Sequence, residues 1–102
     1  MNFHIIFSPE AEEQLAALYG YIAGAASPNV AAGYVEAIVQ YCESLATFPH
    51  RGTKRDDIRP GLRITHYKKR CSIAFAIHDN HVSILGVFYG GRDYESILSK
   101  KG

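Results

Sequence analysis

The sequence is poor in cysteine and has no long apolar run, and each shortage excludes a class of protein. Its two cysteines, Cys42 and Cys71, are too few for a disulfide scaffold. They are expected to be reduced core residues, with a disulfide between them as the open alternative. No apolar stretch approaches the roughly 18 residues that a membrane-spanning helix needs. The N-terminus has no basic segment before its short apolar run, so no secretory signal is expected and the protein is predicted to be cytoplasmic.

Positive charge is missing from residues 1–49, which hold several glutamates but no Lys or Arg. Residues 50–70 reverse this balance, with Asp56 and Asp57 as their only acidic side chains. The net charge of +1 predicts no partner, but the asymmetry favours an anionic one. The open alternative is that these cations belong to a solvated loop and an edge strand, where lysine prevents pairing with the edges of other molecules and so prevents aggregation. The cations of this segment are Arg51, Lys54, Arg55, Arg59, Arg63, Lys68, Lys69 and Arg70.

The chain length of 102 residues fits a single domain that spans residues 1–102. A chain of this size buries roughly 65% of its unfolded surface, which is enough for a core without disulfides. Hydrophobic residues make up 47% of the chain and charged residues 21%, a balance typical of globular rather than disordered proteins.

Two helices are predicted in the first half of the chain. Ser8 is a favourable N-cap with Pro9 at the first helical position, and Ser27 with Pro28 repeats that signal. The first helix should end near Gly24, and the short link makes the pair an antiparallel hairpin that needs a flat partner. The apolar stripes are Ala11, Leu15, Leu18 and Ile22 in the first helix, and Ala31, Tyr34, Val35, Ile38, Cys42 and Leu45 in the second.

Strand-forming runs fill most of the remaining sequence. Residues 3–7 precede the first helix, and residues 62–67, 71–78 and 82–89 form a meander joined by turns. Asp93 is placed to cap a short C-terminal helix. The predicted fold class is therefore α+β with the order β-α-α-β-β-β. An N-terminal strand and an α-helical hairpin are expected to pack on a small antiparallel β-sheet.

Few features of the sequence indicate catalysis or metal binding. The histidines are scattered, and His78 and His81, which flank a predicted turn, are favoured as surface residues over a metal site. Cys42 lies on the predicted apolar helix face, where a reactive thiolate is disfavoured. We therefore predict no metal, no cofactor and no catalytic residue.

Basic and aromatic residues instead gather near the strand ends. This mixture suits single-stranded RNA, which binds by stacking and phosphate pairing. It equally suits the acidic side chains of a protein partner, and tyrosines are also ordinary sheet residues. The residues concerned are Arg63, Lys68, Lys69, Arg70 and Arg92, with Tyr67, Tyr89 and Tyr94 nearby.

Several segments in this order resemble ParE toxins of the RelE/ParE superfamily. They are FSPEAEEQL, SPNVAAGYVEAI, LATFPHRG, RPGLR, CSIAFAIHDN and VSILGVFYGGRD, and the resemblance extends from residue 3 to about residue 98. It implies the toxin of a type II toxin–antitoxin system, a non-enzymatic inhibitor of DNA gyrase. It also implies a ParD-like antitoxin partner, which would lay a C-terminal helix and strand along the toxin's groove and sheet edge.

The RelE branch of the superfamily is the alternative, because its members resemble ParE in fold but cut mRNA on the ribosome. Those enzymes use basic residues on the sheet and a tyrosine in the C-terminal segment. By position Arg92 matches one of these basic residues. Tyr67, however, stands where those enzymes have their sheet arginine, and Leu98 stands near the position of their C-terminal tyrosine. Leucine cannot transfer a proton, although Tyr94 lies one turn earlier. A third alternative is an inactive toxin that retains only antitoxin binding.

The resemblance nominates two sets of contact residues. Each set has a structural alternative. Some hairpin residues must form the core instead of an interface, and Arg63 can serve to tie a loop to the sheet. In the C-terminal segment, Ile97 and Leu98 can pack onto the core instead of contacting a target. No membrane contact is expected, and direct nucleic-acid binding is disfavoured. The target-contact candidates are Arg92, Asp93, Tyr94 and Leu98. The antitoxin-contact candidates are Leu15, Leu18, Tyr19, Ile22, Tyr34, Arg63 and Arg70.

Overall fold

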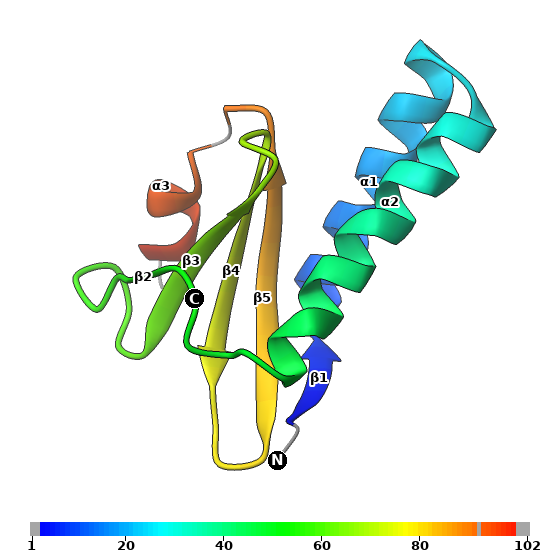
Figure 1. The fold of residues 1–102 in the computed structure, drawn as a ribbon. Helices are drawn as coiled ribbons and strands as arrows, with labels where there is room; N and C mark the ends of the chain where they lie inside the picture. Colours follow the sequence, from blue (N-terminus) through cyan, green and yellow to red (C-terminus); the bar gives the residue numbers. More distant parts are fainter. Residues whose placement is uncertain (1–2, 92, 100–102) are drawn as a thin grey trace.

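Two helices lie against one face of a five-stranded sheet, and a third, short helix covers part of the other face (Figure 1). The computed structural model describes residues 3–91 and 93–99. The elements follow one another as β1 (His4–Phe7), α1 (Pro9–Ala25), α2 (Pro28–Glu43), the 3-10 helix η1 (Ser44–Ala46), β2 (Thr53–Lys54), β3 (Leu62–Tyr67), β4 (Cys71–Ile77), β5 (His81–Tyr89) and α3 (Tyr94–Ser99). The predicted α+β class is confirmed.

The helical hairpin begins at the two predicted serine caps. Ser8 Oγ accepts a hydrogen bond from the backbone N–H of Ala11 at 3.0 Å, and Ser27 Oγ accepts one from Val30 at 3.2 Å. Each cap is followed by a proline in the first turn, where a missing N–H does no harm. α1 ends at Ala25, one residue beyond the glycine that was expected to stop it.

The sheet has the strand order β1-β5-β4-β3-β2. β3, β4 and β5 form the antiparallel meander that the sequence predicts. β1, however, joins the edge of β5 in parallel, with His4 opposite His81 and Phe7 opposite Ile84. The sheet is therefore mixed and not wholly antiparallel. After β1, at one edge of the sheet, the helical hairpin and the loop that follows it carry the chain to the opposite edge. There β2, a two-residue strand that the sequence did not predict, pairs with β3.

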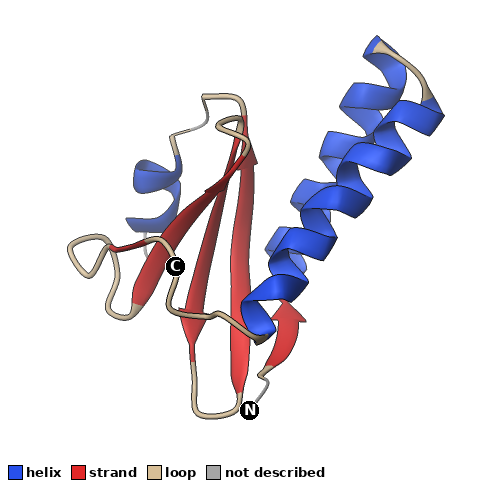
Figure 2. Cartoon of the chain, in the orientation of Figure 1, coloured by secondary structure: helices blue, strands red, loops and turns tan. Residues whose placement is uncertain are grey.

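Figure 2 shows helices on both sides of the strands. Two apolar clusters hold these layers together, one on each face of the sheet. The larger cluster lies between the helical hairpin and the sheet and is centred on Ile38, Phe75 and Ile84, all fully buried. The smaller cluster lies under α3. Its buried members are Leu62, Ile64, Ala74, Phe88 and Leu98. Within residues 3–91 and 93–99, no helix is both long enough and apolar enough to cross a membrane.

The C-terminal helix begins as predicted. Asp93 Oδ1 accepts a hydrogen bond from the backbone N–H of Ser96 at 3.2 Å, which caps α3. Arg59 Nη2 then donates to the carbonyl oxygen of Leu98 at 2.8 Å and fixes the other end of the helix. Arg55 adds a salt bridge to Glu95 at 3.0 Å. The loop between β2 and β3 therefore fastens α3 to the sheet.

Candidate functional site

The outer edge of β5 is only half covered by another strand. β1 pairs with β5 from His81 to Ile84, and the chain then turns away at Ser8 into α1. β5 itself continues to Tyr89. The second half of β5 therefore has α1, and not a strand, beside its outer edge (Figure 1).

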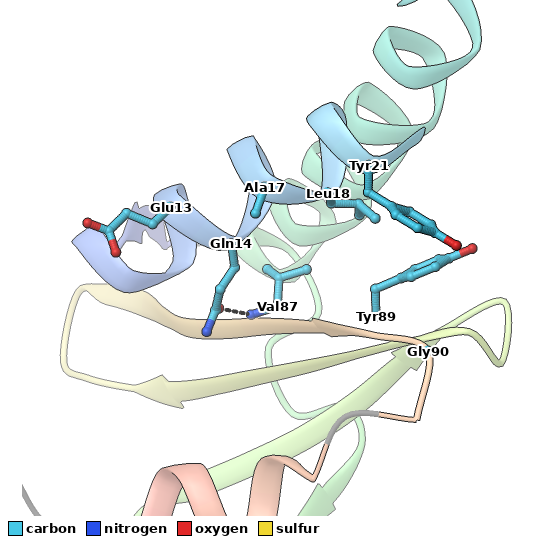
Figure 3. A pocket seen from close by; sticks show the side chains of 8 residues that line it. All are labelled: Glu13, Gln14, Ala17, Leu18, Tyr21, Val87, Tyr89 and Gly90. Atoms are coloured by element: carbon cyan, nitrogen blue, oxygen red, sulfur yellow. Dashed lines mark hydrogen bonds between the residues drawn. The ribbon is translucent and has the colours of Figure 1, made fainter. Parts of the chain in front are cut away.

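Two side chains take the place of the missing strand. Ser8 Oγ donates a hydrogen bond to the carbonyl oxygen of Leu85 at 3.2 Å. Gln14, from α1, accepts a hydrogen bond from the backbone N–H of Val87 on its side-chain oxygen at 2.6 Å (Figure 3). Buried backbone groups need partners, so these side chains satisfy an edge that would otherwise be open. Side chains are easier to move aside than a paired strand.

A groove of about 660 Å³ runs along this half-covered edge. Figure 3 shows Glu13 at one end of it, and Tyr21 and Tyr89 facing each other at the other end. The two tyrosine rings lie 6.4 Å apart, and Tyr21 is 65% exposed. The groove joins an apolar floor to hydroxyl and carboxylate groups at its ends. Its lining residues are Glu13, Gln14, Ala17, Leu18, Tyr21, Val87, Tyr89 and Gly90.

The hairpin residues nominated for antitoxin contact divide between groove and core. Leu18 lines the groove, although only a small part of it is exposed. Leu15 belongs to the buried cluster, and Ile22 and Tyr34 pack against that cluster. Tyr19 is exposed on α1 outside the groove lining. The structure thus leaves Leu18 as the one member of this set that borders the groove.

Sequence reasoning missed most of the groove. Gln14, Leu18 and Tyr21 follow a 4-3 spacing, so they form a second stripe that shares Leu18 with the apolar one on α1. That spacing could have predicted the groove-lining face of α1, but the stripe contains a polar glutamine and so does not stand out as an apolar pattern. No pattern in the neighbouring sequence predicts that Tyr89 lines the groove, because this depends on where β1 stops pairing with β5.

Tyr34 lies where α2 crosses the sheet, within an aromatic cluster. Its ring contacts those of Tyr67 and Tyr89, with centroids 6.2 and 5.8 Å away. Its hydroxyl oxygen is buried and has no hydrogen-bond partner among the described residues. Burial raises the pKa of Tyr34, nearby Cys71, Tyr89 and Tyr67 raise it further, and Arg70 lowers it. Tyr34 is therefore a partly buried tyrosine that packs against the larger cluster.

The basic segment separates into structural and exposed cations. Arg63 Nη1 donates a hydrogen bond to the carbonyl oxygen of Arg51 at 3.1 Å and so ties the loop before β2 to the sheet. This is the structural role that the sequence left open for Arg63. Arg55 forms two 2.9 Å hydrogen bonds with Asp57, and they lower the pKa of that carboxyl group. With Arg59 holding α3, these cations serve the fold. Arg70 is exposed, in the turn between β3 and β4.

The C-terminal candidates are also divided. Arg92 lies outside the described residues. Asp93 is exposed, and the ring of Tyr94 packs partly against Phe88 with a centroid separation of 6.1 Å. Leu98 is only 6% exposed and belongs to the smaller apolar cluster, so it has little surface for a partner. Ile97, which was not nominated, is 41% exposed.

The histidine, cysteine and acidic side chains form neither a metal site nor a complete catalytic triad in the described part of the chain. No group of three or more His, Cys, Asp or Glu side chains is arranged there to hold a metal ion. His78 and His81 stack with ring centroids 4.4 Å apart at the hairpin end. Ser72 Oγ and His66 Nδ1 lie 3.2 Å apart on an exposed part of the sheet. Among the described hydrogen bonds none joins that imidazole to a carboxylate, the third group that usually orients such a pair.

These features define a small α+β domain with a half-open sheet edge. The model of the family "ParE toxin of type II toxin-antitoxin system, parDE" matches residues 5–94, and the chain belongs to this family. It is a ParE-type toxin of a type II toxin–antitoxin system. A search of curated proteins finds no match.

Solved structures with the same fold include two toxin–antitoxin systems. A chain of the chromosomal ParDE system from P. aeruginosa has a TM-score of 0.75 and 21% identity, covering 86% of this chain and 96% of that chain. A chain of the RelBE2 toxin–antitoxin complex from Mycobacterium tuberculosis has a TM-score of 0.62 and 18% identity, covering 87% of this chain and 99% of that one. At these identities the likeness establishes the fold and confirms the RelE/ParE-like arrangement.

Proposed function

We propose that this toxin inhibits DNA gyrase and that a ParD-like antitoxin neutralises it by occupying the groove between α1 and β5. The single observation that carries the antitoxin part is the half-open edge of β5 with an apolar groove beside it. Membership of the ParE family supports gyrase as the target.

A polypeptide segment fits the chemistry of this groove. The outer edge of β5 presents backbone groups that a strand or an extended tail can pair with, and Gln14 and Ser8 now occupy two of them. Ala17 leaves space on α1, while Leu18 and Val87 offer an apolar contact. The solved neighbours are themselves toxin–antitoxin systems, which supports a protein antitoxin as the occupant.

The exposed side of α3 is the best candidate for target contact. Asp93 and Ile97 face solvent there, whereas Leu98 faces the sheet. Two features support an inhibitor over a nuclease. Tyr67 is packed among other tyrosines at the position where the resemblance to RelE expects a sheet arginine. Leu98, near the position of the expected tyrosine, is buried and cannot transfer a proton.

The target is tested by expressing the chain from a tightly controlled promoter while monitoring the SOS response and protein synthesis together. SOS induction and filamentous cells with continuing translation are expected, followed by gyrase cleavage complexes in vitro. Prompt translation arrest with cut mRNA and no SOS signal would contradict the gyrase proposal and favour RelE-type chemistry. Growth without either response would mean an inactive toxin.

The antitoxin groove is tested with a matched pair of substitutions on α1. Ala17 lines the groove, whereas its neighbour Ala16 is exposed and does not. Ala17→Trp fills the groove, so the variant should remain toxic but escape rescue by a co-expressed ParD-like antitoxin. Ala16→Trp should be rescued like the unchanged toxin. Equal rescue of both variants would place the antitoxin elsewhere.

A further inference from the structure

An unbroken row of aromatic and cationic side chains crosses the α2 side of the molecule. The Arg51 guanidinium carbon lies 5.9 Å from the ring centroid of Phe48 and 5.3 Å from that of Tyr41. Tyr41 contacts Tyr67 with ring centroids 5.4 Å apart, and Lys68 Nζ lies 5.7 Å from the Tyr67 centroid. These five side chains, the aromatic–cationic row, join the loop after η1, α2 and the end of β3.

The turn at the end of this row is strained. Lys68 and Lys69 have φ angles of 53° and 63°, in the left-handed region that favours glycine or asparagine. The turn is closed by a hydrogen bond from the N–H of Arg70 to the carbonyl oxygen of Tyr67 at 3.3 Å. An Asn-Gly pair would form the same turn with less strain. The sequence instead keeps three successive cations there, and strain of this kind is typical of functional sites.

These cations are not used to hold the described fold together. Arg55 supplies both salt bridges of the described residues, to Asp57 and Glu95. Lys68 and Lys69 are exposed and enter no salt bridge within that part of the chain. Phe48 is 63% exposed, so the face of its ring is open to a ligand.

We propose that the aromatic–cationic row, together with Lys69 and Arg70, binds single-stranded nucleic acid. Unpaired bases stack on aromatic rings and guanidinium planes, and the exposed ring of Phe48 beside Arg51 offers such a platform. Lys68 lies against the last ring of the row, and Lys69 and Arg70 follow it in the same turn, where a phosphate backbone would pass. An acidic peptide would use the cations but would gain little from the rings. The family resemblance disfavoured nucleic-acid binding, and the sequence alone did not show that Phe48, Arg51 and Tyr41 lie in one row with Tyr67 and Lys68.

This surface shares no residue with the antitoxin groove, although the two meet where the backbone N–H of Gly90 donates to the carbonyl oxygen of Arg70 at 2.9 Å. The groove is lined by α1, β5 and Gly90, whereas the row is built from α2, β3 and their neighbouring loops. The inference therefore does not depend on the target or the antitoxin proposed above.

The test is the fluorescence anisotropy of labelled oligonucleotides, titrated with the intact protein in about 50 mM salt. The probes are oligo-dT and oligo-U strands of about 12 nucleotides, with a duplex of the same length for comparison. Lys68→Asn/Lys69→Gly removes two cations but keeps the turn, and Phe48→Leu removes the exposed ring. Ala16→Glu/Ala32→Glu lowers the net charge by the same two units at exposed helix positions and is the control.

Single strands should bind more tightly than the duplex. The turn variant and Phe48→Leu should each weaken binding by about fivefold or more, and the charge control by much less. The turn variant should also reduce the slope of log affinity against log salt by about 1.4. Preference for oligo-dT or oligo-U then identifies DNA or RNA as the ligand. Absence of binding, equal effects of all three variants, or better competition by a polyglutamate peptide than by unlabelled oligonucleotide would overturn the proposal.

Discussion

The side-chain oxygen of Gln14 accepts a hydrogen bond from the backbone N–H of Val87 at 2.6 Å, so a side chain of α1 satisfies a donor of β5 that a neighbouring strand would otherwise satisfy. β1 ends before it reaches this part of β5, and Gln14 therefore covers an edge that would otherwise attract another chain. The same bond must break when a strand pairs with β5. Gln14 is thus a reversible cover for the proposed antitoxin site.

Replacing Gln14 by alanine should separate stability from binding. The unpaired Val87 N–H should lower the free energy of unfolding by about 1 kcal/mol, measured by urea denaturation. Antitoxin affinity should rise by up to about fivefold, because the bound state no longer competes with the Gln14 bond. Gln40→Ala removes an exposed glutamine from α2 and is the control. A loss of affinity in the Gln14 variant would mean that Gln14 stays in place when the antitoxin binds.

Gly86 is expected to tolerate no side chain. A Cβ atom there would lie 2.6 Å from two ring carbons of Phe88, a residue that is only 2% exposed within the smaller apolar cluster. Gly86→Ala should therefore lower the free energy of unfolding by about 1–3 kcal/mol. Gly20→Ala, in the α1 interior with nothing within 4 Å, should raise it by about 0.5–1 kcal/mol. Equal effects of the two changes would contradict the packing around β5.

The strained turn after β3 should be easy to stabilise. Lys68→Asn/Lys69→Gly places residues that prefer positive φ where the chain already has φ angles of 53° and 63°. The free energy of unfolding should rise by about 1 kcal/mol, measured by thermal or chemical denaturation. If the variant is less stable than the unchanged protein, the two lysines must make contacts that the turn geometry does not reveal.

Both thiols should be unreactive while the protein is folded. Burial raises the pKa of Cys42 from the ordinary thiol value of 9.0 to about 12, and that of Cys71 to about 11. Because the folded pKa values are the higher ones, the neutral thiols stabilise the fold fully below pH 9. This contribution is lost as the pH rises through 11 to 12.

A disulfide-exchange reagent at about pH 8 tests the thiols directly. Reaction should be at least about tenfold slower than for free cysteine, and denaturant should release both thiols. A thiol that reacts at the free rate in the folded protein would show that one cysteine is accessible to solvent.

Adjacent residues of α3 should have different effects when changed. Leu98→Ala removes a buried side chain from the smaller cluster and should lower the free energy of unfolding by about 2–3 kcal/mol. Ile97→Ala should change stability by less than about 0.5 kcal/mol but reduce toxicity, if the exposed side of α3 meets the target. Full toxicity of a stable Ile97 variant would remove this face of α3 from the proposed mechanism.

The order and type of the main elements were accessible from the sequence because their signals are local. Ser8 and Ser27 mark helix starts, and Asp93 marks the last one, through side chains that reach only three residues along the chain. The parallel pairing of β1 has no such signal, since it depends on which strand the hairpin leaves uncovered. The two-residue strand β2 was too short to produce a pattern.

The candidate sites were harder to predict, for a similar reason. Arg55 and Arg59 look like surface cations in the sequence, yet they hold α3 through contacts about forty positions away. The sequence left Leu98 open as a target contact or as a residue packed inward, and the structure places it on the sheet. Periodicity identifies the apolar face of a helix. It does not tell which residues at the margin of that face line a groove, as Leu18 and Tyr21 do.

The pairing of β1 with β5 also affects how the toxin is made. Ser8 bonds to Leu85, 77 positions later, and His4 pairs with His81. Contacts between such distant residues form late, because the intervening chain must be brought together first. On the ribosome the first strand therefore waits, unpaired, until almost the whole polypeptide has emerged. A nascent chain that is released or cleaved before β5 lacks the strand that lies between β1 and β4, so neither the half-covered edge nor the groove beside it can form.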